Sequence, residues 1–145
     1  MLRFGTIMVA ALLLAAAAAT ANGHESAKPP PPPKAEKPAL PIKFYQTRRG
    51  MVLADYKGMT LYYFDRDDTG NKSTCDGKCT EKWIPLAASD DAKALGDFTV
   101  IVRSDKTKMW AYRYRPLYTS RDDQAPGDTN GADPSNLWHI ARPAN

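Results

Sequence analysis

Two cysteines, Cys75 and Cys79, are the only thiol-bearing residues in the sequence, and Asp-Gly-Lys separates them. Asp76-Gly77 is a turn-forming dipeptide that brings the two sulfurs within reach of each other. The first residues of the chain indicate export, and exported thiols meet an oxidising environment. The pair therefore predicts a disulfide. A redox-active dithiol is disfavoured, because that motif has two intervening residues at a helix N-terminus.

Copper binding is an alternative use of the same cysteines. A Cys-x3-Cys pair joined by a histidine supplies the soft thiolate and imidazole ligands that suit copper. His139 is the only histidine outside the first 41 residues. A single histidine beside a tryptophan is more often a packed or hydrogen-bonded residue. Copper at Cys75, Cys79 and His139 is thus the less favoured interpretation.

An aspartate-rich loop offers a second metal chemistry, because alternating oxygen donors around a glycine bend are what calcium requires. The register of an EF-hand loop falls on Asp65, Asp67, Thr69, Gly70, Asn71 and Asp76. Thr69 is a weak donor, and Asp76 stands where a bidentate glutamate is usual. Side chains that bond nearby backbone amides in an Asx-rich turn are the favoured alternative.

Catalytic constellations are missing from the sequence. It contains no Gly-x-Ser-x-Gly elbow and no phosphate-cradling glycine loop, and His139 is the sole candidate base beyond the N-terminal segment. Asp122 and Asp123 are adjacent, so on a strand they point to opposite faces and form no carboxylate pair. We expect a protein that is not an enzyme.

A Tyr-x4-Asp pattern occurs twice, and a leucine precedes each tyrosine. The two copies are 56 positions apart, and each ends at a tryptophan. The matching residues are Tyr62, Asp67 and Trp83 in the first copy and Tyr118, Asp123 and Trp138 in the second. Such a repeat predicts a duplicated unit whose apolar faces cover each other, with the tyrosines and tryptophans in the core. The aspartates would then cap the turn that follows each tyrosine strand.

Short runs of β-branched and aromatic residues lie between turn signals, whereas no segment after residue 41 keeps the spacing of a long amphipathic helix. The runs are residues 51–54, 60–64, 98–103, 109–114, 117–118 and 137–140, and residues 79–83 suit a single helical turn. The alternation of Tyr112 to Arg115 reads as strand. These patterns predict an all-β fold, a small antiparallel domain over residues 42–145 with pseudo-repeats at about 51–86 and 98–143.

The N-terminal residues predict processing and spacing. Residues 1–21 have an early Arg3, an apolar run and the triplet Ala19-Thr20-Ala21, the layout of a cleaved signal peptide. The apolar run is shorter than the ~20 residues of a spanning helix, so we expect no integral membrane segment after cleavage. Residues 22–41 are rich in proline and predict a disordered linker.

Charge gives no indication of a nucleic-acid partner. The formal net charge is +4, from 20 Lys and Arg against 16 Asp and Glu. Arg113 and Arg115 alternate with Tyr112 and Tyr114, an aromatic and basic mixture that nucleic-acid binders use, but export from the cytoplasm argues against that role.

The segments "GMTLYYFDRDD", "CDGKCTEKWIPL", "WAYRYRPLYTSRDDQAPGDTNG" and "LWHI" together resemble a secreted-repeat family marked by the Tyr-x4-Asp motif, often described as predicted lipoproteins. The chain departs from that family in lacking the lipid-attachment cysteine and in having Ile84-Pro85 where a double proline is frequent. The resemblance implies an architecture and an exported compartment, and the family has no established activity.

Together these patterns predict an exported binding or structural module of the periplasm or cell envelope. Its partner would be an envelope protein or a cell-wall component. The alternative is a metal-binding protein, with calcium at the aspartate loops or copper at the cysteines and His139.

Overall fold

The computed structural model describes residues 40–67, 71–132, 135 and 137–144. The predicted signal peptide over residues 1–21 and the predicted linker up to residue 39 lie outside these residues. Thr69 and Gly70 of the calcium-type register also lie outside them. In the described part of the chain, no helix is long and apolar enough to cross a membrane.

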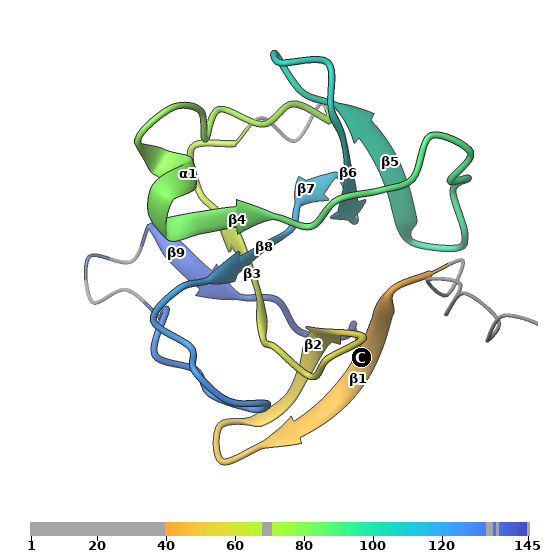
Figure 1. The fold of residues 1–145 in the computed structure, drawn as a ribbon. Coiled ribbons are helices and arrows are strands. Elements are labelled where there is room, and N and C mark those ends of the chain that lie inside the picture. The colour runs from red at the N-terminus through yellow and green to blue at the C-terminus, as the bar shows by residue number, and fades with distance from the viewer. Residues whose placement is uncertain (1–39, 68–70, 133–134, 136, 145) are drawn as a thin grey trace, which may run out of the picture. The chain divides into compact units, whose positions relative to one another are not determined.

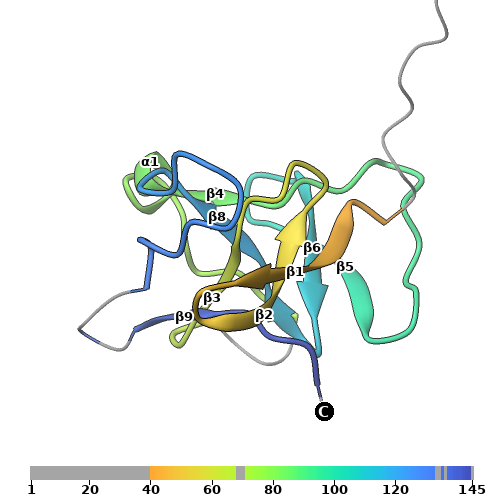
Figure 2. The same ribbon diagram turned by 90° about the horizontal axis from the view of Figure 1, so that it is seen from below.

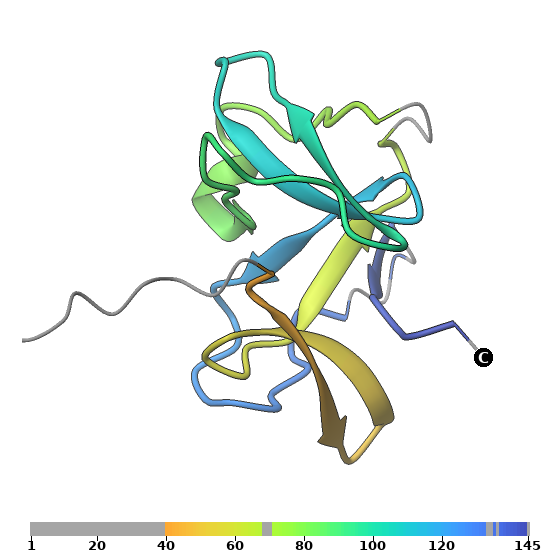
Figure 3. The ribbon, with the colours of Figure 1, turned by 90° about the vertical axis from the view of Figure 1, so that its right-hand side faces the viewer.

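The described residues form antiparallel strands with a single short helix, so the predicted all-β class is confirmed. The strands are β1 (Ile42–Thr47), β2 (Gly50–Asp55), β3 (Leu61–Phe64), β4 (Trp83–Pro85), β5 (Phe98–Val102), β6 (Lys108–Tyr112), β7 (Arg115–Pro116), β8 (Tyr118–Ser120) and β9 (Trp138–Ile140), and the helix α1 is Cys79–Lys82. They make three sheets, β1-β2, β4-β8-β3-β9 and β5-β6-β7. Figures 1 and 3 show the four-stranded sheet between the β1-β2 hairpin and the β5-β6-β7 sheet.

The central sheet has the symmetry of the repeat. Its inner strands β3 and β8 pair antiparallel with Tyr62 opposite Tyr118, which relates the two copies by a pseudo-twofold axis at that point. The outer strands are exchanged, because β4 of the first copy pairs with β8 and β9 of the second copy pairs with β3. Each copy therefore completes the sheet of the other.

Backbone hydrogen bonds outside the ladders repeat this exchange. The Ala141 N–H donates to Leu61 O at 2.8 Å, and the equivalent Leu86 N–H donates to Leu117 O at 2.9 Å. The Leu53 N–H donates to Ala141 O, as the Trp110 N–H donates to Leu86 O, both at 2.8 Å. The hairpins β1-β2 and β5-β6 are thereby tied to the last strand of the other copy.

The predicted strand over residues 109–114 needs correction at its end, and the first described strand was not predicted. Arg113 and Tyr114 do not continue β6; they form the two-residue turn to β7, with φ of 48° and 66°. Paired positive φ values give a turn whose twist matches a hairpin, and the usual glycine signal is absent here. The strand that was not predicted is β1, which follows the proline-rich segment and in which Phe44 is 64% exposed.

Candidate functional site

The motif tyrosines and aspartates pair across the two copies. The Tyr62 hydroxyl donates to Asp123 Oδ2 at 2.8 Å, and the Tyr118 hydroxyl donates to Asp67 Oδ2 at 2.8 Å. Both tyrosines have no exposed surface, as the predicted core position requires. Each aspartate therefore accepts a hydrogen bond from the other copy.

The second oxygen of each aspartate holds the loop that follows it. Asp67 Oδ1 accepts the Thr74 N–H at 2.8 Å, and Asp123 Oδ1 accepts the Asn130 N–H at 2.7 Å. The two acceptors are seven residues before their donors in both copies. The aspartates thus hold the turns after the tyrosine strands, as predicted. The spacing within one copy did not indicate that each aspartate also bonds the tyrosine of the other copy.

The hydroxyl oxygens of the tyrosines have a further partner. The Gly131 N–H donates to Tyr62 Oη at 3.2 Å, and Ser73 Oγ lies 2.6 Å from Tyr118 Oη. Gly131 also lies so close to Tyr62 and Ser120 that a Cβ at this position would meet Ser120 Cβ at 2.6 Å. Only glycine lets the backbone approach the hydroxyl here.

Burial sets the electrostatics of these pairs. Desolvation raises the pKa of Asp67 above its ordinary 3.8, against the opposing effects of the Thr74 and Tyr118 hydrogen bonds and the Arg103 charge. Desolvation likewise raises the pKa of Asp123, although the Tyr62 hydrogen bond lowers it. The pKa values of both tyrosines are raised, first by burial and also by the neighbouring carboxylates. Both hydroxyls are therefore firm donors at neutral pH.

Aromatic rings fill the space beside the pairs. Trp83 and Trp138 stack with centroids 3.7 Å apart, and Phe64 stacks on Trp138 at 4.4 Å. Tyr62 and Trp83 make an edge-to-face contact with ring centroids 5.3 Å apart, and Tyr118 and Trp138 do so at 5.1 Å. Both tryptophans are buried. They are packing residues, and less than a tenth of either residue is exposed, which is too little for a ligand ring to stack on.

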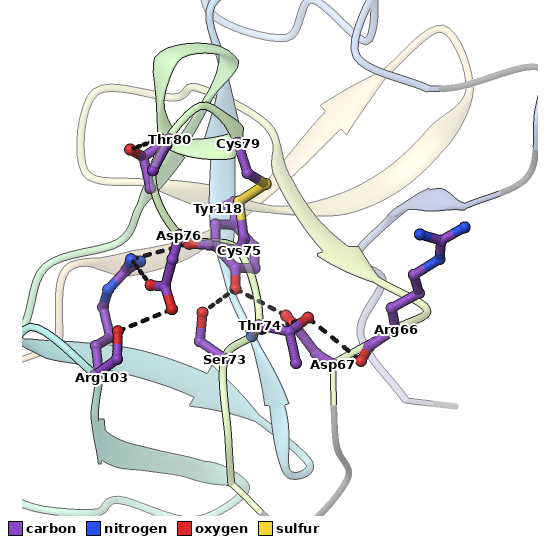
Figure 4. The surroundings of a disulfide bond; sticks show 12 residues. Arg66, Asp67, Ser73, Thr74, Cys75, Asp76, Cys79, Thr80, Arg103 and Tyr118 are labelled. Carbon is purple, nitrogen blue, oxygen red and sulfur yellow. Dashed lines mark hydrogen bonds and ion pairs between the residues drawn. A yellow bond between two sulfur atoms is a disulfide. The ribbon is translucent and has the colours of Figure 1, made fainter.

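The two cysteines form a disulfide, which confirms the prediction. Figure 4 shows it above the Ser73, Tyr118 and Asp67 contacts, with Arg103 reaching the same segment from the other copy. Arg103 Nη2 donates to Cys75 O at 2.9 Å and to Asp76 Oδ1 at 2.8 Å. The bridge therefore stabilises the loop that supplies partners to the second tyrosine.

The residues predicted as metal ligands have separate partners. Asp65 pairs with His139, Asp67 with Tyr118, and Asp76 with Arg103. Among the described residues, no group of three or more His, Cys, Asp or Glu side chains is placed to hold a metal ion. The copper interpretation needs two thiolates, and both sulfurs are in the disulfide.

His139 belongs to a cluster on the outer face of the β3-β9 pair, which we call the Tyr63 cluster (Tyr63, Asp65, Arg115 and His139). His139 Nε2 lies 2.7 Å from Asp65 Oδ2, and its ring stacks on Tyr63 with centroids 5.1 Å apart. The Arg115 guanidinium lies 4.5 Å from the Tyr63 centroid and 3.8 Å from Asp65 Oδ1. Four side chains thus cover this face.

The pseudo-equivalent face of the β8-β4 pair is open. It holds a cleft of about 540 Å³, within the ~300–1,000 Å³ usual for ligand sites. Figure 2 shows β4 next to β8, and the lining of this cleft comes mainly from these two strands and from the turn between β2 and β3. We call it the Ile84 cleft, and its lining residues are Pro41, Asp55, Tyr56, Lys57, Met59, Ile84, Pro85, Leu86, Ala87, Thr119, Ser120, Arg121 and Asp123.

Strand register explains why one face is open and the other filled. Ile84 lies opposite Thr119 in the β4-β8 ladder, as His139 lies opposite Tyr63 in the β9-β3 ladder. A stacked ring pair on one face is therefore replaced by an isoleucine and a threonine on the other. The repeat pattern of the sequence does not predict this site, because the site lies where the two copies differ.

The site and fold define a two-copy antiparallel β module, with exchanged strands and reciprocal buried pairs. The chain belongs to the family described as a secreted repeat of unknown function, whose model matches residues 43–87 and 99–142. This confirms the resemblance and the two repeats, and the first matched copy begins at the second residue of β1. No curated protein and no solved structure matches the chain. The family description and the disulfide both agree with a location outside the cytoplasm.

Proposed function

We propose that this chain is an exported binding module of the periplasm or cell envelope that holds an envelope protein through the Ile84 cleft. Its motif residues act as a scaffold, and it performs no catalytic step. The observation that carries the proposal is the difference between the two pseudo-equivalent faces, since one is filled by the Tyr63 cluster and the other is a cleft of about 540 Å³.

Two features support a binding rather than a purely structural role. The four motif side chains turn inward and bond one another, so they are not available to a partner. The β2-β3 turn in the lining is also held in place, because the Asp55 carboxylate accepts the N–H groups of Lys57 and Met59, both at 2.9 Å. A preformed cleft binds at a smaller entropic cost than one that must be ordered first.

Photocrosslinking in cells that export the chain tests the proposal. A photoreactive phenylalanine analogue replaces Ile84 on the cleft, and the same analogue replaces Tyr114 on the exposed β6-β7 turn as the control. We expect a discrete crosslinked adduct from position 84 and none from position 114. An absence of adducts at position 84, or equal adducts at both positions, would contradict the proposal.

A further inference from the structure

The floor of the Ile84 cleft is apolar. Leu86 is buried at its base, Met59 and Pro85 are half-buried, and Ile84 remains 38% exposed beside them. Covering exposed apolar surface with a partner lowers the free energy of the system and so favours binding. The cleft therefore suits a ligand that carries an aliphatic or aromatic side chain.

Two cations, Lys57 and Arg121, stand in the lining of this floor, and both residues are exposed. The Arg121 guanidinium donates from Nε to Glu81 O at 2.6 Å, and Lys57 Nζ lies 5.6 Å from the Tyr56 centroid. Within the described ranges, neither cation has a carboxylate within ion-pair distance, whereas Lys82, Arg103, Lys108, Arg113 and Arg115 each have one.

The two carboxylates of the lining do not offset these cations, because both are committed inside the fold. Asp55 Oδ1 accepts the N–H groups of Lys57 and Met59. Asp123 accepts the Tyr62 hydroxyl on Oδ2 and the Asn130 N–H on Oδ1. Both residues are less than a tenth exposed. The exposed charges that face a ligand in the cleft are therefore the two cations, whereas the two carboxylates are buried.

The edge of β4 argues against a ligand that binds as an added strand. Pro85 has no N–H to donate, and the N–H and C=O groups of Leu86 bond Leu117 and Trp110. Strand addition needs a row of free backbone groups. Recognition at this cleft consequently depends on side chains and charge.

Resting on the proposed function, we propose that the partner segment is an acidic peptide, in which an aliphatic or aromatic side chain is flanked by carboxylates. The apolar side chain packs on Met59 and Ile84, and the carboxylates pair with Lys57 and Arg121. The chemistry of the cleft thus specifies a class of partner as well as a place for it.

Fluorescence anisotropy with the chain from Asn22 to its end tests the inference. The probe is a fluorescein-labelled peptide of Gly and Ser with a central leucine pair flanked by glutamates. Lysine replaces glutamate in one comparison peptide, and serine replaces leucine in another. We expect saturable binding of the acidic peptide alone, weakening as salt screens the charges.

Charge variants locate the site. Lys57→Gln with Arg121→Gln should raise the Kd about tenfold, equivalent to about 1.4 kcal/mol. Lys43→Gln with Lys72→Gln removes the same net charge from other exposed positions and should change the Kd less than about twofold, since neither residue lines the cleft. Equal weakening by both pairs would show unspecific attraction and overturn the inference.

A second variant closes the cleft with the chain's own side chains. Thr119→Tyr with Ile84→His copies the ring pair of the Tyr63 cluster onto the open face, and peptide binding should be lost while thermal melting remains cooperative. Continued binding would overturn the inference. So would binding to phosphatidylglycerol vesicles that is tighter than binding to the acidic peptide and absent with phosphatidylcholine vesicles, because the acidic group recognised would then be a lipid headgroup.

The two proposals fail separately. Adducts at position 84 without binding of the acidic peptide would reject only the class of ligand. Binding of the acidic peptide without adducts in the cell would reject the proposed envelope role and leave the chemistry of the cleft in place.

Discussion

Each motif tyrosine donates a hydrogen bond from its hydroxyl to the aspartate of the other copy, at 2.8 Å in both pairs. A hydrogen bond to a charged group contributes about 1.5–3 kcal/mol, and here it also satisfies a carboxylate that burial would otherwise leave costly. The tyrosine and the aspartate of each pair therefore stabilise each other, and loss of either leaves the other without its buried partner. Asp67 or Asp123 without its tyrosine is a poorly partnered buried charge.

The raised pKa values of Asp67 and Asp123 give a pH dependence of definite sign. A carboxyl whose pKa is higher in the folded state binds protons more tightly there, so its stabilising contribution is full below the ordinary 3.8 and is lost as pH rises through the folded-state pKa. The wild type should therefore have a larger free energy of unfolding than the Asp67→Asn, Asp123→Asn double variant, and this difference should decrease as pH rises from 3.8 toward neutrality. Urea denaturation across that range measures it.

Asp105 provides a control of opposite sign. Hydrogen bonds from Thr107 lower its pKa, so its contribution is present above 3.8 and lost as pH falls. The excess of the wild type over Asp105→Asn should then increase with pH. Parallel profiles for the two comparisons would contradict the assignment of desolvation as the dominant effect at the motif aspartates.

At the scale of elements, several contacts hold the segment of residues 71–78, which precedes α1. Thr74 bonds Asp67, Ser73 bonds Tyr118, and the disulfide joins Cys75 to the first residue of α1. Arg103 then connects this loop to the end of β5-β6 in the other copy. The bridge is one of several attachments, so the loop does not depend on it alone.

Removal of the disulfide should therefore weaken the fold without abolishing it. The closed loop is short, and loop-closure entropy gives about 2 kcal/mol for the loss in Cys75→Ser with Cys79→Ser. Denaturant unfolding measures the difference, and dithiothreitol should lower the stability of the wild type only. Loss of a cooperative transition in the variant would show that the bridge is essential to the fold.

Sequence patterns predicted the strands and core residues that occur in both copies. They did not predict which strand or side chain of the other copy each of these contacts. The period of 56 placed Tyr62 and Tyr118 in the core correctly, but spacing within one copy does not tell which aspartate each tyrosine meets. The turn at Arg113 and Tyr114 lacks the glycine that usually marks it, so alternation was read as strand. The Ile84 cleft was missed because it is a difference between copies.

At the scale of the whole molecule, the two copies are interleaved rather than joined end to end. β4 and β9 each pair with the inner strand of the other copy, and the stacked tryptophans that begin them meet between the copies. No half of the central sheet is complete without the other. The duplicated sequence therefore specifies one cooperative domain whose surface is free to differ between its two equivalent faces.

Double-mutant cycles test this exchange most directly. Tyr62→Phe is combined with Asp123→Asn in one cycle and with Asp67→Asn in the other, and unfolding free energies are measured in urea. The exchanged pairing predicts a coupling of about 1 kcal/mol or more between Tyr62 and Asp123, and less than about 0.5 kcal/mol between Tyr62 and Asp67. The reverse result, with coupling confined to the tyrosine and aspartate of the same copy, would contradict the account.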